Sequence, residues 1–93
     1  MIKTPKFRTG AVVATPRAID AFAEAHVEMF YFLKRHLYGD WGDLDDEDKA
    51  SNDAAVVDGD RILSAYTLPT GSKIWIITEA DRSATTFLLP EDY

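Results

Sequence analysis

The sequence predicts an α+β fold, in which N-terminal helices pack on one face of a C-terminal antiparallel meander of three to four strands. Apolar residues recur at helical spacing in the first part of the chain, and the period becomes two from Arg61 onward. Because helices precede strands, we expect them to cover one sheet face and leave the other partly open. A chain of 93 residues suits a single domain, residues 1–93, with residues 1–9 as a flexible N-terminal arm.

The first helical segment is predicted to begin at Thr15-Pro16, where the Thr hydroxyl can cap free amides and Pro16 takes the first helical position. Gly39 is placed to end it. Residues at helical spacing would line its apolar face: Ile19, Phe22, Ala23, His26, Phe30, Leu33 and Leu37. The stretch fits either one helix of about 22 residues or two helices with a break near His26.

A second helix is expected after residues 40–44, where turn-forming residues surround Trp41. Asp43 or Asp45 can cap it, and the carboxylates of residues 46–48 would face the positive end of its dipole. Gly59 is predicted to stop it. A narrow apolar stripe on this helix consists of Ala50, Ala54 and Val57.

Three strands are predicted from the alternation of side chains in residues 61–68, 73–78 and 84–89, with turns between them. β-branched and aromatic residues are frequent in these segments, as is typical of strands. A short additional strand at residues 11–15 is a further expectation, since Gly10 precedes an Ala-Val-Val run. Trp75, Tyr66 and the threonines are the candidates for a binding surface on the open sheet face.

Charge is distributed unevenly along the chain, whose formal net charge is −6 at pH 7. Residues 1–37 carry six basic and three acidic groups, whereas residues 40–60 carry nine acidic groups against Lys49 alone. Binding to phosphate backbones requires cationic groups that displace counterions, so general nucleic-acid binding is not expected. A protein partner with a basic surface would complement the acidic segment.

The acidic segment resembles the start of a calcium loop, but it fails the later requirements. Asp43, Asp45 and Glu47 fall at the first three odd positions, yet Asp48 stands where a glycine is needed and Ala54 where a bidentate glutamate should be. The chain has no cysteine, which excludes disulfides, thiolate zinc sites and a cysteine nucleophile. We therefore expect no metal and no cofactor.

The two histidines are too few for a structural zinc site. His26 is expected to be a partly buried packing residue on the apolar helix face. His36, in the last turn, is expected to be a surface group that complements the helix dipole, or else an acid or base beside Trp41. No window approaches the roughly 20 apolar residues of a membrane span, so we expect no membrane partner and a cytoplasmic location.

Two sequence strings carry a resemblance to a known family: GDWGDLD at residues 39–45 and ITEADRS at residues 77–83, followed by the C-terminal residues 88–93. From about Thr9 to its C-terminus the chain resembles a family of short bacterial proteins associated with plasmids and integrative elements, usually called plasmid-related or hypothetical proteins. The resemblance implies a mobile-element context. It implies no mechanism, because the family brings no established activity.

The function expected from these observations is that of a non-enzymatic interaction module, which binds a protein partner through an acidic surface that contains a tryptophan. The expected partner-binding residues are Asp40, Trp41, Asp43, Asp45 and Asp46. Exposed aromatic side chains often dominate binding energy. Trp41 fits either an exposed anchor of this kind or a plug that closes the edge of the core.

An alternative is a small endoribonuclease or toxin, because residues 75–87 are similar to the last strand pair of barnase-like ribonucleases. Glu79 would then act as base, with Arg61 and Arg82 holding the phosphate. That family has a histidine as general acid where Arg82 stands, so this set lacks a good proton donor. His36 is the fourth candidate residue under this alternative. The other interpretation of this hairpin tip is a solvated turn.

Overall fold

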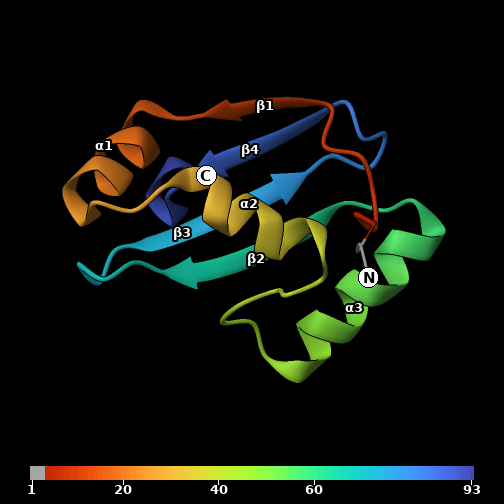
Figure 1. The fold of residues 1–93 in the computed structure, drawn as a ribbon. Coiled ribbons are helices and arrows are strands. Elements are labelled where there is room, and N and C mark those ends of the chain that lie inside the picture. Colours follow the sequence, from red (N-terminus) through yellow and green to blue (C-terminus); the bar gives the residue numbers. More distant parts are fainter. Residues whose placement is uncertain (1–3) are drawn as a thin grey trace.

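The computed structural model describes residues 4–93. The elements, in chain order, are β1 (Ala11–Ala14), α1 (Pro16–Ala25), α2 (Met29–Leu37), α3 (Asp46–Asp58), β2 (Ile62–Thr67), β3 (Lys73–Thr78), β4 (Ala84–Leu88) and the short 3₁₀ helix η1 (Pro90–Asp92). The fold is α+β, as predicted, with the helices preceding the three strands of the meander (Figure 1). No helix in residues 4–93 has the length and apolar character needed to cross a membrane.

The sheet contains four strands in the order β1-β4-β3-β2. β2, β3 and β4 form the predicted antiparallel meander, with Ser64 opposite Ile76 and Ile76 opposite Phe87. β1 lies at the edge and pairs with β4 in parallel, so that Ala11 lies opposite Ala84. The additional N-terminal strand therefore makes the sheet mixed.

The first helical segment is two helices, because the chain leaves the helix at His26. His26 has the left-handed conformation, with φ of 55°, and its amide closes the last turn of α1. Thr15 caps α1 through its hydroxyl, which accepts a hydrogen bond from the Ala18 amide at 3.1 Å, and Pro16 follows at the first position as predicted. The prediction that His26 is partly buried is wrong, because the chain leaves the helix at this residue and its side chain is exposed to solvent.

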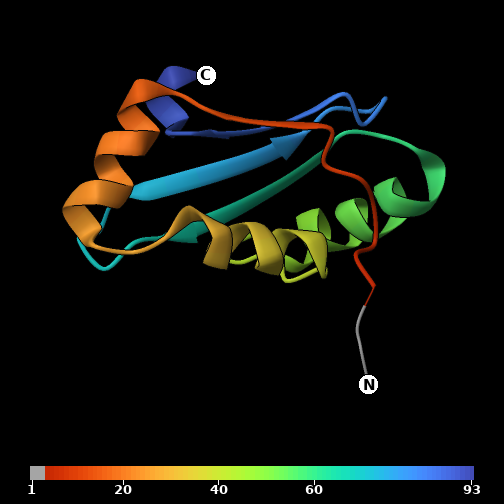
Figure 2. The ribbon, with the colours of Figure 1, turned by 45° about the horizontal axis from the view of Figure 1, so that its top comes forward.

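The helices cover one face of the sheet. α2 crosses in front of the strands, α1 packs at one end and α3 lies beside β2 (Figures 1 and 2). The main core between α1, α2 and the sheet contains Ala18, Ala21, Phe22, Phe32, Tyr66, Leu68, Ile74, Ile76 and Phe87. Tyr66 lies in this core, whereas Trp75 pairs with Ala65 on the other face. The prediction that Tyr66 helps to form an open binding face is therefore wrong.

α3 packs on the sheet with a different face from the stripe seen in the sequence. Its buried residues are Asn52 and Ala55, and Ala55 joins Trp41 and Ile62 in a second, smaller core cluster. The predicted stripe of Ala50, Ala54 and Val57 is exposed to solvent instead.

The N-terminal segment is tied to the domain from residue 6 onward. The Lys6 amide donates a hydrogen bond to the Leu37 carbonyl at 2.9 Å. The Phe7 ring stacks on Trp41, with 6.2 Å between centroids, and packs against the second core cluster. This part of the expected flexible arm is packed structure, while residues 1–3 of that arm lie outside the described residues.

Candidate functional site

Trp41 is a core residue and not an exposed anchor. Its side chain is only 3% exposed, and it packs with Ala55 and Ile62. The indole Nε1 donates a hydrogen bond to Oδ1 of Asp53 at 3.0 Å, which satisfies its one polar group. Trp41 is therefore the plug that closes the edge of the core. The prediction that it is an exposed anchor for a partner is wrong.

The loop that carries Trp41 is pinned to the outer edge of β2. The Ala65 amide donates to the Trp41 carbonyl at 3.2 Å, and the Asp43 amide donates to the Ala65 carbonyl at 2.7 Å. Gly42 lies between these contacts with φ of 76°, and a Cβ there would lie 1.9 Å from the Ala65 oxygen. Only glycine fits, because both the backbone conformation and the close approach exclude a side chain.

Asn52 protects the same edge two residues away, at Leu63. Its Nδ2 donates to the Leu63 carbonyl at 2.6 Å, and its Oδ1 accepts from the Leu63 amide at 3.2 Å. Together with the Trp41 loop, this side chain satisfies the outward polar groups of Leu63 and Ala65, which would otherwise be open to another strand. This role of Asn52 was not predicted, although a polar residue among the small residues of α3 is a visible signal in the sequence.

The aspartates predicted to bind a partner differ in the hydrogen bonds and ion pairs that they already form within the domain. Asp40 forms an ion pair with Arg35, with Oδ2 at 2.7 Å from Nε, and this hydrogen bond lowers the pKa of the Asp40 carboxyl. Asp43 accepts a hydrogen bond from Thr67, and Asp45 caps α3 by accepting from the Asp48 amide at 2.8 Å. The predicted cap at Asp45 is confirmed.

The outer face of α3 combines exposed carboxylates with an apolar stripe. The exposed acidic residues of the helix are Asp46, Glu47, Asp48, Asp53 and Asp58, of which Asp53 accepts the indole hydrogen bond of Trp41, and Asp60 follows the helix. Within the described part of the chain, no ion pair involves a residue of α3. Val57, at 84%, is the most exposed of the large hydrophobic residues in residues 4–93, and Ala50 and Ala54 lie on the same side of the helix.

His36 is fully buried, so its predicted position on the surface is wrong. Its Nδ1 lies 2.5 Å from Ser64 Oγ, and its Nε2 lies 2.9 Å from Thr78 Oγ1. Thr78 continues the chain of hydrogen bonds to Thr85 at 2.7 Å. Burial lowers the pKa of His36 to about 3, because a charged imidazole would lose its hydration there.

A buried imidazole of this kind cannot reach a substrate. It therefore cannot serve as the acid or base that either sequence interpretation assigned to it. The signal that the sequence analysis passed over is the inward position of three polar residues, Ser64, Thr78 and Thr85, on strands whose other inward residues are apolar. Such a row requires a polar partner on the helical layer.

The three remaining residues of the ribonuclease alternative meet at one corner, but in structural roles. Arg61 Nε lies 3.8 Å from Glu79 Oε1, and both side chains are partly exposed. Arg82 donates to the carbonyls of Asp60, Glu79, Ala80 and Ala55 at 2.6–3.3 Å. Its guanidinium joins the hairpin tip to the end of α3, so its donors are directed at backbone and not at a phosphate.

Comparisons with known proteins give no assignment: no family model, no curated protein and no solved structure matches the chain. The resemblance to proteins of plasmids and integrative elements therefore stays a prediction. Within residues 4–93, no group of three or more His, Asp or Glu side chains is arranged to hold a metal ion.

Proposed function

We propose that the protein is a non-enzymatic interaction module, which binds a basic protein surface through the outer face of α3. The observation that carries the proposal is the exposed stripe of Ala50, Ala54 and Val57, which lies among carboxylates that form no ion pair within residues 4–93. A helix usually turns its apolar stripe toward the core. Here α3 buries Asn52 and Ala55 and leaves the stripe outside.

The two parts of this face support different aspects of binding. Contact at Val57 would bury apolar surface and so contribute binding free energy. The surrounding carboxylates would orient a basic partner and raise the rate of association. Asp46 belongs to this surface. Asp40, Asp43 and Asp45 precede α3 and are already engaged by Arg35, Thr67 and the Asp48 amide. The face differs from the sequence hypothesis in two respects, since Val57 replaces Trp41 as the apolar contact and Asp46 is the one aspartate of the predicted set that lies on it.

The test is capture of a partner from a host lysate by immobilised protein, with two variants of similar character. Val57→Lys should lose the partner, because it places a cation in the proposed contact with a basic surface. Ile19→Lys is the matched control, since Ile19 is also an exposed apolar residue but lies on α1. Capture should weaken as salt rises, because the exposed carboxylates are screened. Equal capture by both variants would contradict the proposal.

A further inference from the structure

The two edges of the sheet differ in the protection of their backbone. β2 is the protected edge, because Asn52 and the Trp41 loop occupy its outward groups at Leu63 and Ala65. β1 is the other edge and is the outermost strand in both overall views (Figures 1 and 2). Its sequence, Ala-Val-Val-Ala, contains no charge and no proline. Charged residues and proline are the features by which proteins commonly prevent an edge strand from pairing with another chain, so β1 lacks this protection.

The backbone groups that β1 offers follow from its pairing with β4. Ala11 donates its amide to Ser83 at 3.0 Å, and Thr15 donates its amide to Phe87 at 3.0 Å. In a parallel pair, alternate residues direct both N–H and C=O to the same neighbour. The amides and carbonyls of Val12 and Ala14 therefore point away from the sheet.

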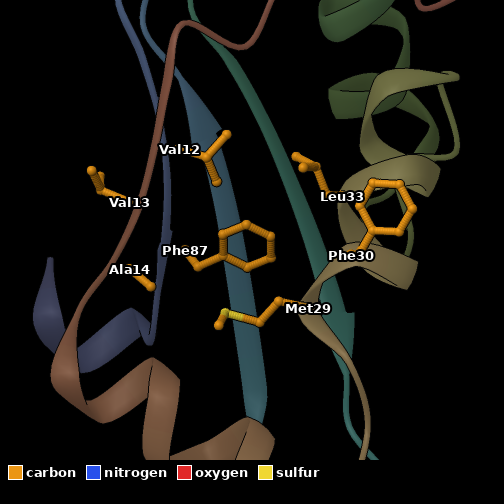
Figure 3. Close-up of a pocket in the computed structure, with 7 residues that line it drawn as sticks. All are labelled: Val12, Val13, Ala14, Met29, Phe30, Leu33 and Phe87. Carbon is orange, nitrogen blue, oxygen red and sulfur yellow. The ribbon is translucent and has the colours of Figure 1, made fainter.

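The side chains of this edge are apolar and exposed on both faces. Val12 points toward α2 and lines a cavity of about 270 Å³ whose other walls include Met29, Leu33 and Phe87 (Figure 3). Val13 points away from α2 and is 47% exposed. A strand that paired with β1 would cover part of both surfaces.

We propose that a second copy of this chain pairs with β1 in an antiparallel manner, so that a two-fold axis passes by Val13. In this register Val12 of each copy lies opposite Ala14 of the other, and each such pair exchanges both N–H···O bonds. Val13 lies opposite the Val13 of the second copy in the closer, non-hydrogen-bonded arrangement. The two sheets then form one continuous sheet.

Three features favour a second copy over another occupant. β2 is blocked, so extension at β1 alone closes at two copies and does not continue into a fibre. The acidic α3 lies beside β2, at the opposite edge from β1, so the two acidic faces point apart in the dimer. A flexible peptide would lose conformational entropy on pairing and would gain contacts along only four residues. The β1 strand of a second copy is already ordered, so its pairing costs less entropy. The inference does not depend on the proposed function of α3.

Sedimentation velocity over a range of concentrations tests the dimer. The parent should be a dimer at high concentration and should approach the 10.4 kDa monomer on dilution. Val13→Lys should weaken the dimer by more than about tenfold, because like charges would then lie directly opposite each other. Ile19→Lys, at a residue that is 49% exposed on α1, should dimerise like the parent. A parent that stays monomeric, or a Val13→Lys variant that still dimerises, would overturn the proposal.

Hydrogen exchange of the parent gives a second measurement that needs no variant. The amides of Val12 and Ala14 should become protected as concentration rises, while the amide of Val13, which faces β4, should be protected throughout. Protection of Val12 and Ala14 that does not change with concentration would also overturn the proposal. This result decides the question even if Val13→Lys does not fold.

Discussion

His36 Nδ1 lies 2.5 Å from Ser64 Oγ, and neither residue is exposed to solvent. With Thr78 at 2.9 Å from Nε2, both ring nitrogens have a hydroxyl partner, so the neutral imidazole is satisfied without water. Hydroxyl groups add no negative charge that would offset the burial of a cation. The pair thus joins α2 to β2 only while His36 is uncharged.

Acid should therefore destabilise the protein through His36. The folded state keeps the imidazole neutral down to a pKa of about 3, whereas the unfolded chain takes up a proton near 6.5. The contribution of His36 is complete above pH 6.5, and it falls by about 1.4 kcal/mol per pH unit as the pH decreases toward 3. Urea unfolding between pH 7 and pH 5 measures this slope, before most carboxylates titrate.

Two variants assign that slope to one residue. His36→Gln should flatten it, even though the variant is less stable at pH 7. His26→Asn, at the exposed end of α1, should keep the acid sensitivity that comes from His36. A parent whose unfolding free energy is constant from pH 7 to pH 5 would contradict the burial of His36.

Trp41→Ala should lower the free energy of unfolding by about 3–5 kcal/mol, because it empties a large buried site. It also leaves the Asp53 carboxylate without its indole donor. Trp75→Ala is the control, since Trp75 is half-buried on the other sheet face, and it should cost less. Denaturant unfolding followed by circular dichroism compares the two. A Trp41→Ala variant as stable as the parent would show that the ring is not core.

Asn52→Ala should destabilise the protein by about 1–3 kcal/mol, because the amide and carbonyl of Leu63 lose their side-chain partner. Asn52→Asp should cost at least as much as Ala, since a buried carboxylate oxygen would then face the Leu63 carbonyl oxygen. Ser51→Ala, at the exposed neighbouring position on α3, should be close to neutral. Thermal melting of the three variants ranks them, and equal melting temperatures would contradict the role of Asn52.

Ile76→Ala should cost about 2–5 kcal/mol, since Ile76 is fully buried at the centre of the sheet. Val57→Ala removes apolar atoms from an exposed position and should change stability by less than about 0.5 kcal/mol. The contrast is measured by urea unfolding at neutral pH. If Val57→Ala were the costlier change, the faces assigned to α3 and β3 would be reversed.

Local signals were sufficient to predict the helices and the meander. Caps at Thr15 and Asp45, and the alternation of residues 61–89, act over short distances in the chain, and each lies where it was expected. The partner of β1 could not be predicted in this way. Four residues contain no information about which distant strand they join, and Ala11 pairs with Ala84.

The helical phase explains the error at His36. The apolar face was traced from Ile19 through to Leu37 as if one helix continued, but the left-handed residue His26 ends α1 and a new helix begins at Met29. Because α2 is a separate helix, its core-facing side does not continue that of α1. Phe32 and His36 therefore face the core, and Phe30 is exposed. Trp41 posed a different problem, because a single aromatic residue in a loop has no periodicity from which its burial could be inferred.

The parallel pairing of β1 with β4 also constrains the order in which the molecule can assemble. β4 is the only neighbour of β1 in the sheet, so the N-terminal strand has no place to bind until residues 84–88 have been synthesised and have joined β3. Contacts this far apart in the chain form late and slow the folding of small domains. During synthesis, the uncharged Ala-Val-Val-Ala segment must therefore wait unpaired until residues 84–88 have emerged.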